Sequence, residues 1–228
     1  MNIYLIIIFV LFFIINYILK KKELFKNNYG LNEIPLILYI NLDHRKDRKE
    51  SLLNQMNNFN NIKLTRIDAI KKKNGALGCA LSHIKALEYA YQQNVNSVLI
   101  LEDDFIWKKE YNITFINSII HKLLNNIHWD VCLLSCNGKK QNFTNNNYYY
   151  SDIICQTTSS YIIKRKYIPI LINFWKNTIK NNELVVKIDI SWKELQKKDK
   201  WICCNPVLGM QLPSYSDIKK RNVNYKGV

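Results

Sequence analysis

The chain has 228 residues and a formal net charge of +15, from 33 lysines and arginines against 18 aspartates and glutamates. This charge suits an anionic partner, but the basic residues are scattered and the composition is typical of AT-rich codons, so we expect no nucleic-acid surface. The 6 cysteines are too sparse for a disulfide scaffold at this length, and we expect most of them to be small buried apolar residues.

The N-terminal segment is strongly apolar. Residues 3–19 are interrupted only by Asn16, and this length is just enough for a helix to cross a bilayer. No basic residue precedes the run and no small-residue cleavage site follows it, which favours a retained anchor over a cleaved signal peptide. The sequence therefore predicts one N-terminal transmembrane helix.

Three segments follow from this interpretation: an anchor with a basic flank at 1–22, a short stem at 23–33 and a catalytic domain at 34–228. The lysine run directly after the apolar segment favours a domain that faces the cytosol. Sequons at Asn112 and Asn142 leave the luminal orientation open.

The folded domain alternates strand and helix patterns. Apolar runs of strand length cover residues 35–42, 62–70, 97–101 and 129–135, and helical patterns cover 43–59, 76–93 and 113–124. Strands that alternate with helices predict an α/β domain with a mostly parallel central sheet, covered on both faces.

Three acids follow directly after the apolar residues 98–101. In a parallel sheet the ligand binds outside the carboxyl ends of the strands. If the strand continues, Glu102 and Asp104 share one side and Asp103 faces the other. Two hard oxygen donors suit Mg²⁺ or Mn²⁺ bound to a diphosphate. The alternative interpretation of these acids is a helix N-cap or a solvated turn. The buried strand directly before them favours the metal site over this alternative.

Four motifs occur in order along the domain: YINLDHRKDR at 39–48, RIDAI at 66–70, GALGCALSHIKAL at 75–87 and VLILEDDF at 98–105. In this order and spacing they resemble glycosyltransferase family 25, which includes lipooligosaccharide (lipopolysaccharide) and collagen galactosyltransferases. The resemblance implies a GT-A type nucleotide-sugar-binding fold, a UDP-sugar donor and Mn²⁺ or Mg²⁺ held by the acidic motif.

The resemblance also implies roles for individual residues. Glu102 and Asp104 would hold the metal. The donor would be bound by Asn41, Asp43, Arg48, Gly78, His83 and Asp103. Several of these have a structural alternative: helix capping or a solvated charge cluster for the residues at 41–48, core packing for His83 and a simple turn for Gly78.

Inverting transfer needs a carboxylate that takes a proton from the acceptor hydroxyl. Asp189 matches a late acid of the family and is the first candidate for the base or for positioning the acceptor. Asp217 is the second, with a helix N-cap as its alternative.

The function implied by the resemblance is metal-dependent transfer of a hexose, galactose or glucose, from a UDP-sugar to a hydroxyl of a glycan or protein. A catalytically inactive, membrane-tethered binding or scaffold protein of the same fold is the alternative. A metal-dependent phosphohydrolase that uses the same carboxylates is a weaker one.

Overall fold

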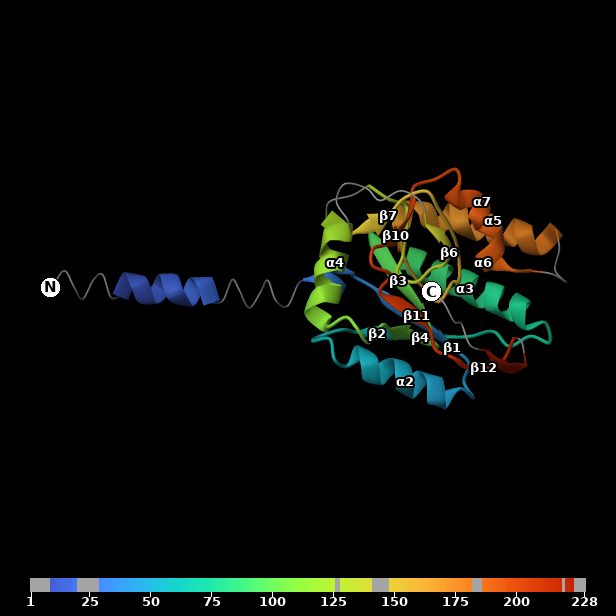
Figure 1. The fold of residues 1–228 in the computed structure, drawn as a ribbon, viewed down its shortest axis with the longest axis horizontal. Coiled ribbons are helices and arrows are strands. Elements are labelled where there is room, and N and C mark those ends of the chain that lie inside the picture. Colours follow the sequence, from blue (N-terminus) through green and yellow to red (C-terminus); the bar gives the residue numbers. More distant parts are fainter. Residues whose placement is uncertain are drawn as a thin grey trace.

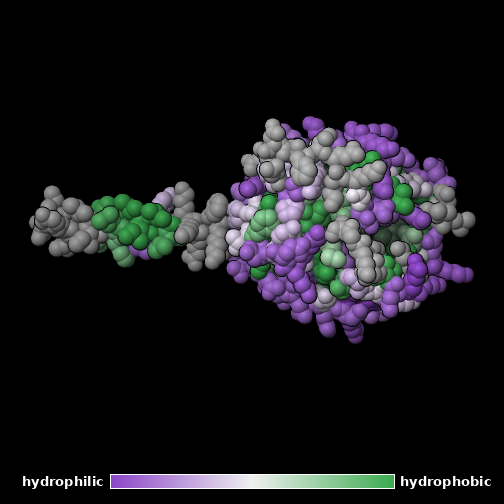
Figure 2. Space-filling view, in the orientation of Figure 1, coloured by the Kyte–Doolittle hydropathy of each residue, from purple (hydrophilic) through white to green (hydrophobic). Residues whose placement is uncertain are grey.

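The computed structural model describes residues 9–19, 29–125, 128–140, 148–181, 186–218 and 220–223. Residues 9–19 are helical, and their apolar side chains form the hydrophobic surface in Figure 2. The remainder of the expected membrane span, residues 3–8, lies outside the described residues, as does Asn142. Within the described ranges, no helix is both long enough and apolar enough to cross a membrane.

The centre of the domain is a seven-stranded sheet with the order β2-β1-β3-β9-β5-β10-β7. Its strands are β1 (Ile37–Asn41), β2 (Leu64–Asp68), β3 (Ser97–Glu102), β5 (Val131–Leu133), β7 (Tyr149–Tyr150), β9 (Ser160–Lys164) and β10 (Trp201–Cys204). β1 pairs in parallel with β2 and β3, and β5 pairs in parallel with β10. Only β9 and β7 run in the opposite direction. The predicted α/β fold with a mostly parallel sheet is confirmed.

Helices cover both faces of this sheet (Figure 1). They are α2 (Lys46–Met56), α3 (Gly75–Gln92), α4 (Ile113–Asn125), α5 (Ile168–Asn181), α6 (Ile188–Ser191) and α7 (Lys193–Gln196), with 3-10 turns η1 (Gly30–Glu33) and η2 (Arg165–Tyr167). Alternate residues of β1 enter two separate cores: Leu38 packs with α3 and α5, whereas Tyr39 packs with α2 and α4. A strand buried on both faces explains why the sequence shows a continuous apolar run.

Three two-stranded sheets complete the domain. They pair β4 (Phe105–Trp107) with β11 (Gly209–Gln211), β12 (Ser214–Ser216) with β13 (Arg221–Val223), and β6 (Asn137–Lys140) with β8 (Ile153–Gln156). The β4–β11 pair brings the C-terminal segment against the end of β3, where the Leu212 amide donates to the carbonyl of Asp104 at 2.7 Å. A side chain at Gly209 would clash with the Phe105 ring, so this close crossing requires glycine.

The cysteines differ from the expectation in one respect. Cys136 and Cys155 form a disulfide that joins the segment after β5 to β8. Cys132, Cys203 and Cys204 lie outside this disulfide and are buried, as expected. The spacing of 19 residues between the bonded cysteines carries no pairing signal in the sequence, because only the β6–β8 hairpin brings them together.

Candidate active site

A cavity of about 430 Å³ opens at the carboxyl ends of β1 and β3. Glu102, Asp103 and Asp104 all line it, together with Arg48 and His83. β3 ends at Glu102, and the next two residues form a turn before β4. The predicted alternation of the three acids required the strand to continue past Glu102, and it does not, so Asp103 lines the same cavity as its neighbours. The turn is buried, so neither a helix N-cap nor a solvated turn describes it.

Glu102 is held by one residue of α3 and by one residue of the segment between β8 and β9. Its Oε1 accepts a hydrogen bond from Thr158 at 2.6 Å and lies 3.2 Å from Nε2 of His83. The other ring nitrogen of His83 lies 3.1 Å from the hydroxyl of Tyr161. Burial disfavours the charged carboxylate, but His83, Thr158 and the charge of Arg48 outweigh it and lower the pKa of Glu102. Glu102 is therefore a fixed, ionised carboxylate.

Asp103 is the anchor of a polar network beneath the cavity. Its Oδ2 accepts a hydrogen bond from the Asn41 amide at 2.7 Å, and its Oδ1 accepts one from Arg48 at 3.1 Å. Burial raises the pKa of Asp103 although both partners oppose this shift. Since both carboxylate oxygens are engaged, Asp103 orients other side chains more readily than it could bind a ligand.

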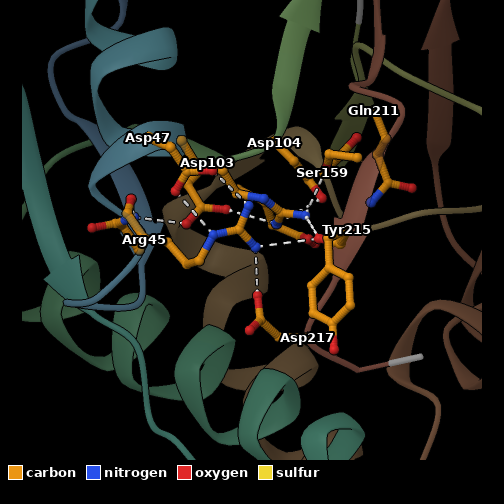
Figure 3. Close-up of polar contacts among 12 residues, drawn as sticks. Arg45, Asp47, Asp103, Asp104, Ser159, Gln211, Tyr215 and Asp217 are labelled. Carbon is orange, nitrogen blue, oxygen red and sulfur yellow. Dashed lines mark hydrogen bonds and ion pairs between the residues drawn. The ribbon is translucent and has the colours of Figure 1, made fainter. Parts of the chain in front are cut away.

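Asp104 is the least satisfied of the three acids. Its Oδ2 lies 3.1 Å from Nη1 of Arg48, while its buried Oδ1 has no hydrogen-bond partner among the described residues. Figure 3 shows Asp103 and Asp104 in the network of polar residues that also contains Arg45 and Asp217. Burial and the charge of Glu102 raise the pKa of Asp104 to about 7. A buried carboxylate oxygen without a partner is costly, and a ligand cation would relieve this cost.

Arg48 does not point freely into the cavity, as a direct phosphate or uracil contact would require. Its Nη1 bridges Asp103 and Asp104, each at 3.1 Å. Its Nη2 donates to the Ser214 hydroxyl at 2.9 Å and to the carbonyl of Tyr215 at 2.8 Å. The guanidinium thus ties α2 and β12 to the acidic turn and partly neutralises it.

Asn41 and Asp43 do not line the cavity. Asn41 is buried, and its amide also donates to the carbonyl of Arg45 at 3.0 Å while its Oδ1 accepts from Arg66 at 3.1 Å. Asp43 is 97% exposed and lies 3.4 Å from Arg66. The structure thus gives Asn41 a structural role beneath the site and leaves Asp43 as a solvated charge.

The two candidates for the base have different environments. Asp217 lines the cavity but is not a helix N-cap, and it accepts hydrogen bonds from Arg45 at 2.6 Å and lies 3.4 Å from His44. Burial opposes this, yet the contacts with Arg45 and His44 lower the pKa of Asp217. Asp189 is half-buried on α6 and does not line the cavity. Burial and the charge of Glu102 raise the pKa of Asp189.

Gly78 serves packing, since a Cβ atom there would lie 2.5 Å from the carbonyl oxygen of Ile70. The loop after β2 therefore rests directly on α3. Ser82 on the same helix accepts a hydrogen bond from the Ile70 amide at 2.7 Å. These contacts fix the loop that carries the next group of residues.

Several residues that line the cavity were not predicted from the sequence to bind a ligand. Lys71, Lys72 and Lys73 line it from the loop after β2, and Gln211 and Tyr215 line it from the C-terminal segment. The lysine run was visible in the sequence, but in a chain of this composition it is not distinctive. Three lysines facing an acidic turn create a site suited to an anionic ligand that also carries a cation.

The donor set fits a divalent metal of the Mg²⁺ or Mn²⁺ type. Asp104 offers an unpaired buried oxygen, and Glu102 offers an ionised carboxylate in the same cavity. Hard oxygen ligands of this kind are the ones that these ions prefer. Cys79 and His83 lie close enough to Glu102 to form another possible ligand group, although thiolate and imidazole suit softer metals.

Fold and site together define an α/β protein with clustered carboxylates and three lysines around one cavity, at the carboxyl ends of parallel strands. The model of glycosyltransferase family 25, described as an LPS biosynthesis protein, matches residues 73–192. This match covers more than half of the chain, and the chain belongs to that family. It is a glycosyltransferase.

The solved structures add resemblances of low degree. One is a glycosyltransferase involved in the glycosylation of the major capsid of PBCV-1, with 12% identity, a TM-score of 0.47 and coverage of 75% of this chain and 81% of the other. Another is UDP-glucose pyrophosphorylase complexed with UDP-glucose, with 10% identity, a TM-score of 0.43 and coverage of 77% and 74%. At such scores these likenesses say nothing about function. No curated protein sequence matches the chain.

Proposed function

We propose that the chain transfers a hexose, galactose or glucose, from a UDP-sugar to a hydroxyl of a glycan or protein. The observation that carries this proposal is the unpaired, buried oxygen of Asp104 in a cavity that is also lined by three lysines. A nucleoside diphosphate bound with a divalent cation would satisfy both features at once, because the cation meets the carboxylates and the diphosphate meets the lysines.

In this proposal, Asp104 and Glu102 hold the metal, which would supply a positive charge that stabilises the departing UDP. Lys71, Lys72 and Lys73 attract and position the diphosphate. Arg48 keeps the acidic turn in place through its contacts with Asp103 and Asp104. Glu102, Asp104 and Arg48 are held by contacts within the protein before the donor arrives, so little reorganisation of the acidic turn is needed.

Of the two candidate bases, we propose Asp189, which lies outside the lining of the cavity but close enough to Glu102 for the two charges to interact. A base must accept a proton near neutral pH, and the pKa of Asp189 is raised by burial and by the charge of Glu102. Asp217 is held in its ionised form by Arg45 and His44, which makes it the weaker proton acceptor. Asp217 instead fits a role in positioning the C-terminal segment.

The decisive experiment is calorimetric titration of UDP into the full chain in nonionic micelles, with and without Mn²⁺. We expect binding that depends on Mn²⁺ and is lost in Asp104→Asn. Asp43→Asn is the matched control, since it removes the same charge from an exposed carboxylate outside the cavity. If folded wild-type protein binds no UDP, the proposal fails and the inactive scaffold is favoured.

The apolar residues 3–19 are proposed to anchor the enzyme in a membrane. The lysine run after them supports a domain that faces the cytosol, whereas the Cys136–Cys155 disulfide is typical of an oxidising compartment. We propose the cytosol-facing orientation. Digestion of the domain by protease added to sealed microsomes supports it, and protection of the domain overturns it.

A further inference from the structure

A second cavity, of about 790 Å³, lies at the opposite ends of the central strands from the catalytic cavity. β9 runs antiparallel to β3. Leu101 pairs with Ser160 at the end of β3 beside the catalytic cavity, and Ser97 pairs with Lys164 at the other end. A strand of this length spans about 17 Å. The second cavity is therefore separate from the glycosyltransferase site.

The lining of this cavity is strongly basic. Lys164, Arg165, Lys166 and Lys200 come from the end of β9, from η2 and from the residue before β10. Among the described residues that line it there is no aspartate or glutamate. Two segments, residues 164–166 and the residue before β10, thus place four basic residues around one hollow, which concentrates positive potential there.

These cations are only partly neutralised by the protein. Lys166 pairs with Asp130 at 2.8 Å. Within the described ranges, the ammonium groups of Lys164 and Lys200 have no carboxylate within 4.0 Å. Lys164 lies 4.3 Å above the ring of Trp129, and burial, together with the charge of Lys166, lowers the pKa of Lys164. An anion in the cavity would relieve this repulsion.

The polypeptide enters the domain on this same side. η1 packs against α4: the amide of Leu31 donates to Asn117 at 3.0 Å, and the side-chain amide of Asn125 donates to Glu33 at 2.7 Å. Asn125, the last residue of α4, lines the cavity. Figure 1 shows α4 well separated from β12, which borders the catalytic cavity.

The apolar N-terminal segment lies within reach of this side. Ten peptide units join residue 19 to residue 29, so the chain between them spans at most about 35 Å. The helix at 9–19 exposes its large apolar side chains, and Phe9, Phe12 and Phe13 are each more than half exposed. A bilayer that covered these side chains would lie within about 35 Å of η1, on the side of the domain that carries the basic cavity.

We propose that the basic cavity around Lys164, Arg165, Lys166 and Lys200 binds the phosphate head group of an anionic membrane phospholipid. The basic cavity then orients the domain on the bilayer, with the catalytic cavity directed away from the membrane surface. Attraction of a lysine to an anionic membrane surface strengthens binding by about fivefold per residue. The site is independent of UDP-sugar binding.

The test uses the full chain in nonionic micelles, titrated calorimetrically with dihexanoyl phosphatidylglycerol, with protein-free micelles as the blank. We expect the double variant Lys164→Gln, Lys200→Gln to bind roughly 25-fold more weakly than the wild type. The control is Lys63→Gln, Lys180→Gln, which removes the same charge from exposed residues outside the cavity, and it should bind as the wild type does.

Equal binding by the wild type and both variants would overturn the proposal. So would equally tight binding of dihexanoyl phosphatidylcholine, which has no net charge. Inorganic phosphate is the third titrant, and if it binds as tightly as the lipid, the cavity is a soluble-anion site and not a head-group site. A UDP titration of the same samples keeps failure of the donor site distinct from failure of this one.

Discussion

Replacement of Asp104 by asparagine should stabilise the metal-free domain at alkaline pH while it abolishes UDP binding. The pKa of Asp104 is raised from 3.8 to about 7 in the folded protein. The folded state therefore holds the proton more tightly than the unfolded state, and stability falls as the pH rises from about 4 to 7. Above pH 7 the accumulated loss is on the order of 4 kcal/mol. Asp104→Asn removes this loss.

The assay is urea unfolding of the full chain in micelles with a chelator, at pH 5 and at pH 8. We expect the variant to gain stability over the wild type at pH 8, by up to about 4 kcal/mol, and to gain less at pH 5. The exposed Asp43→Asn should follow the wild type at both values. A variant that is less stable than the wild type at pH 8 would show that the ionised carboxylate is well solvated or well paired, and the reasoning would be wrong.

Three further predictions concern the metal, the lysine loop and the disulfide. Mn²⁺ should raise the unfolding temperature more at pH 8 than at pH 5, because at low pH it competes with the proton on Asp104, and Asp104→Asn should abolish the difference. Gly78→Ala should cost about 1–3 kcal/mol in urea unfolding, since its Cβ would lie 2.5 Å from the Ile70 carbonyl, and unchanged stability would contradict the packing. Replacing Cys136 and Cys155 by serine opens a loop with a separation of 19 residues and should cost about 3 kcal/mol; the single variant Cys79→Ser, which breaks no disulfide, is the comparison.

The sequence predicted the central strands because a strand that is buried on both faces is a continuous apolar run within its own segment. The apolar run at 97–101 predicts a strand, and the structure has a strand at Ser97–Glu102. The predicted strand at 35–42 contains the observed strand Ile37–Asn41. Helix periodicity likewise located α3 and α4 within one residue at either end. Boundaries were less accurate where charged residues begin the element: α2 begins at Lys46, because residues 42–45 form the turn after β1.

The sequence located the three acids after β3, but the way in which they are arranged depends on tertiary contacts. The position of Glu102, Asp103 and Asp104 after a buried strand is local information. That Asp103 shares the cavity depends on where β3 ends, and that Arg48 bridges two acids depends on the packing of α2 against the sheet. Neither follows from alternation along a single strand.

By itself, the sequence determined the α/β class, the order of the motifs and the acids at the end of β3, because periodicity and composition report which residues of one segment are buried. Only the tertiary structure decided which of the acids keeps an unpaired oxygen, which cysteines bond and that Lys200 joins the basic residues 164–166 around one cavity. These features join residues far apart in the chain: Arg48 and Asp103 are separated by 55 positions, and the second cavity draws on segments from Asn96 to Lys200. Pairing across such distances is set by the register of strands and the packing of helices, which no local pattern records.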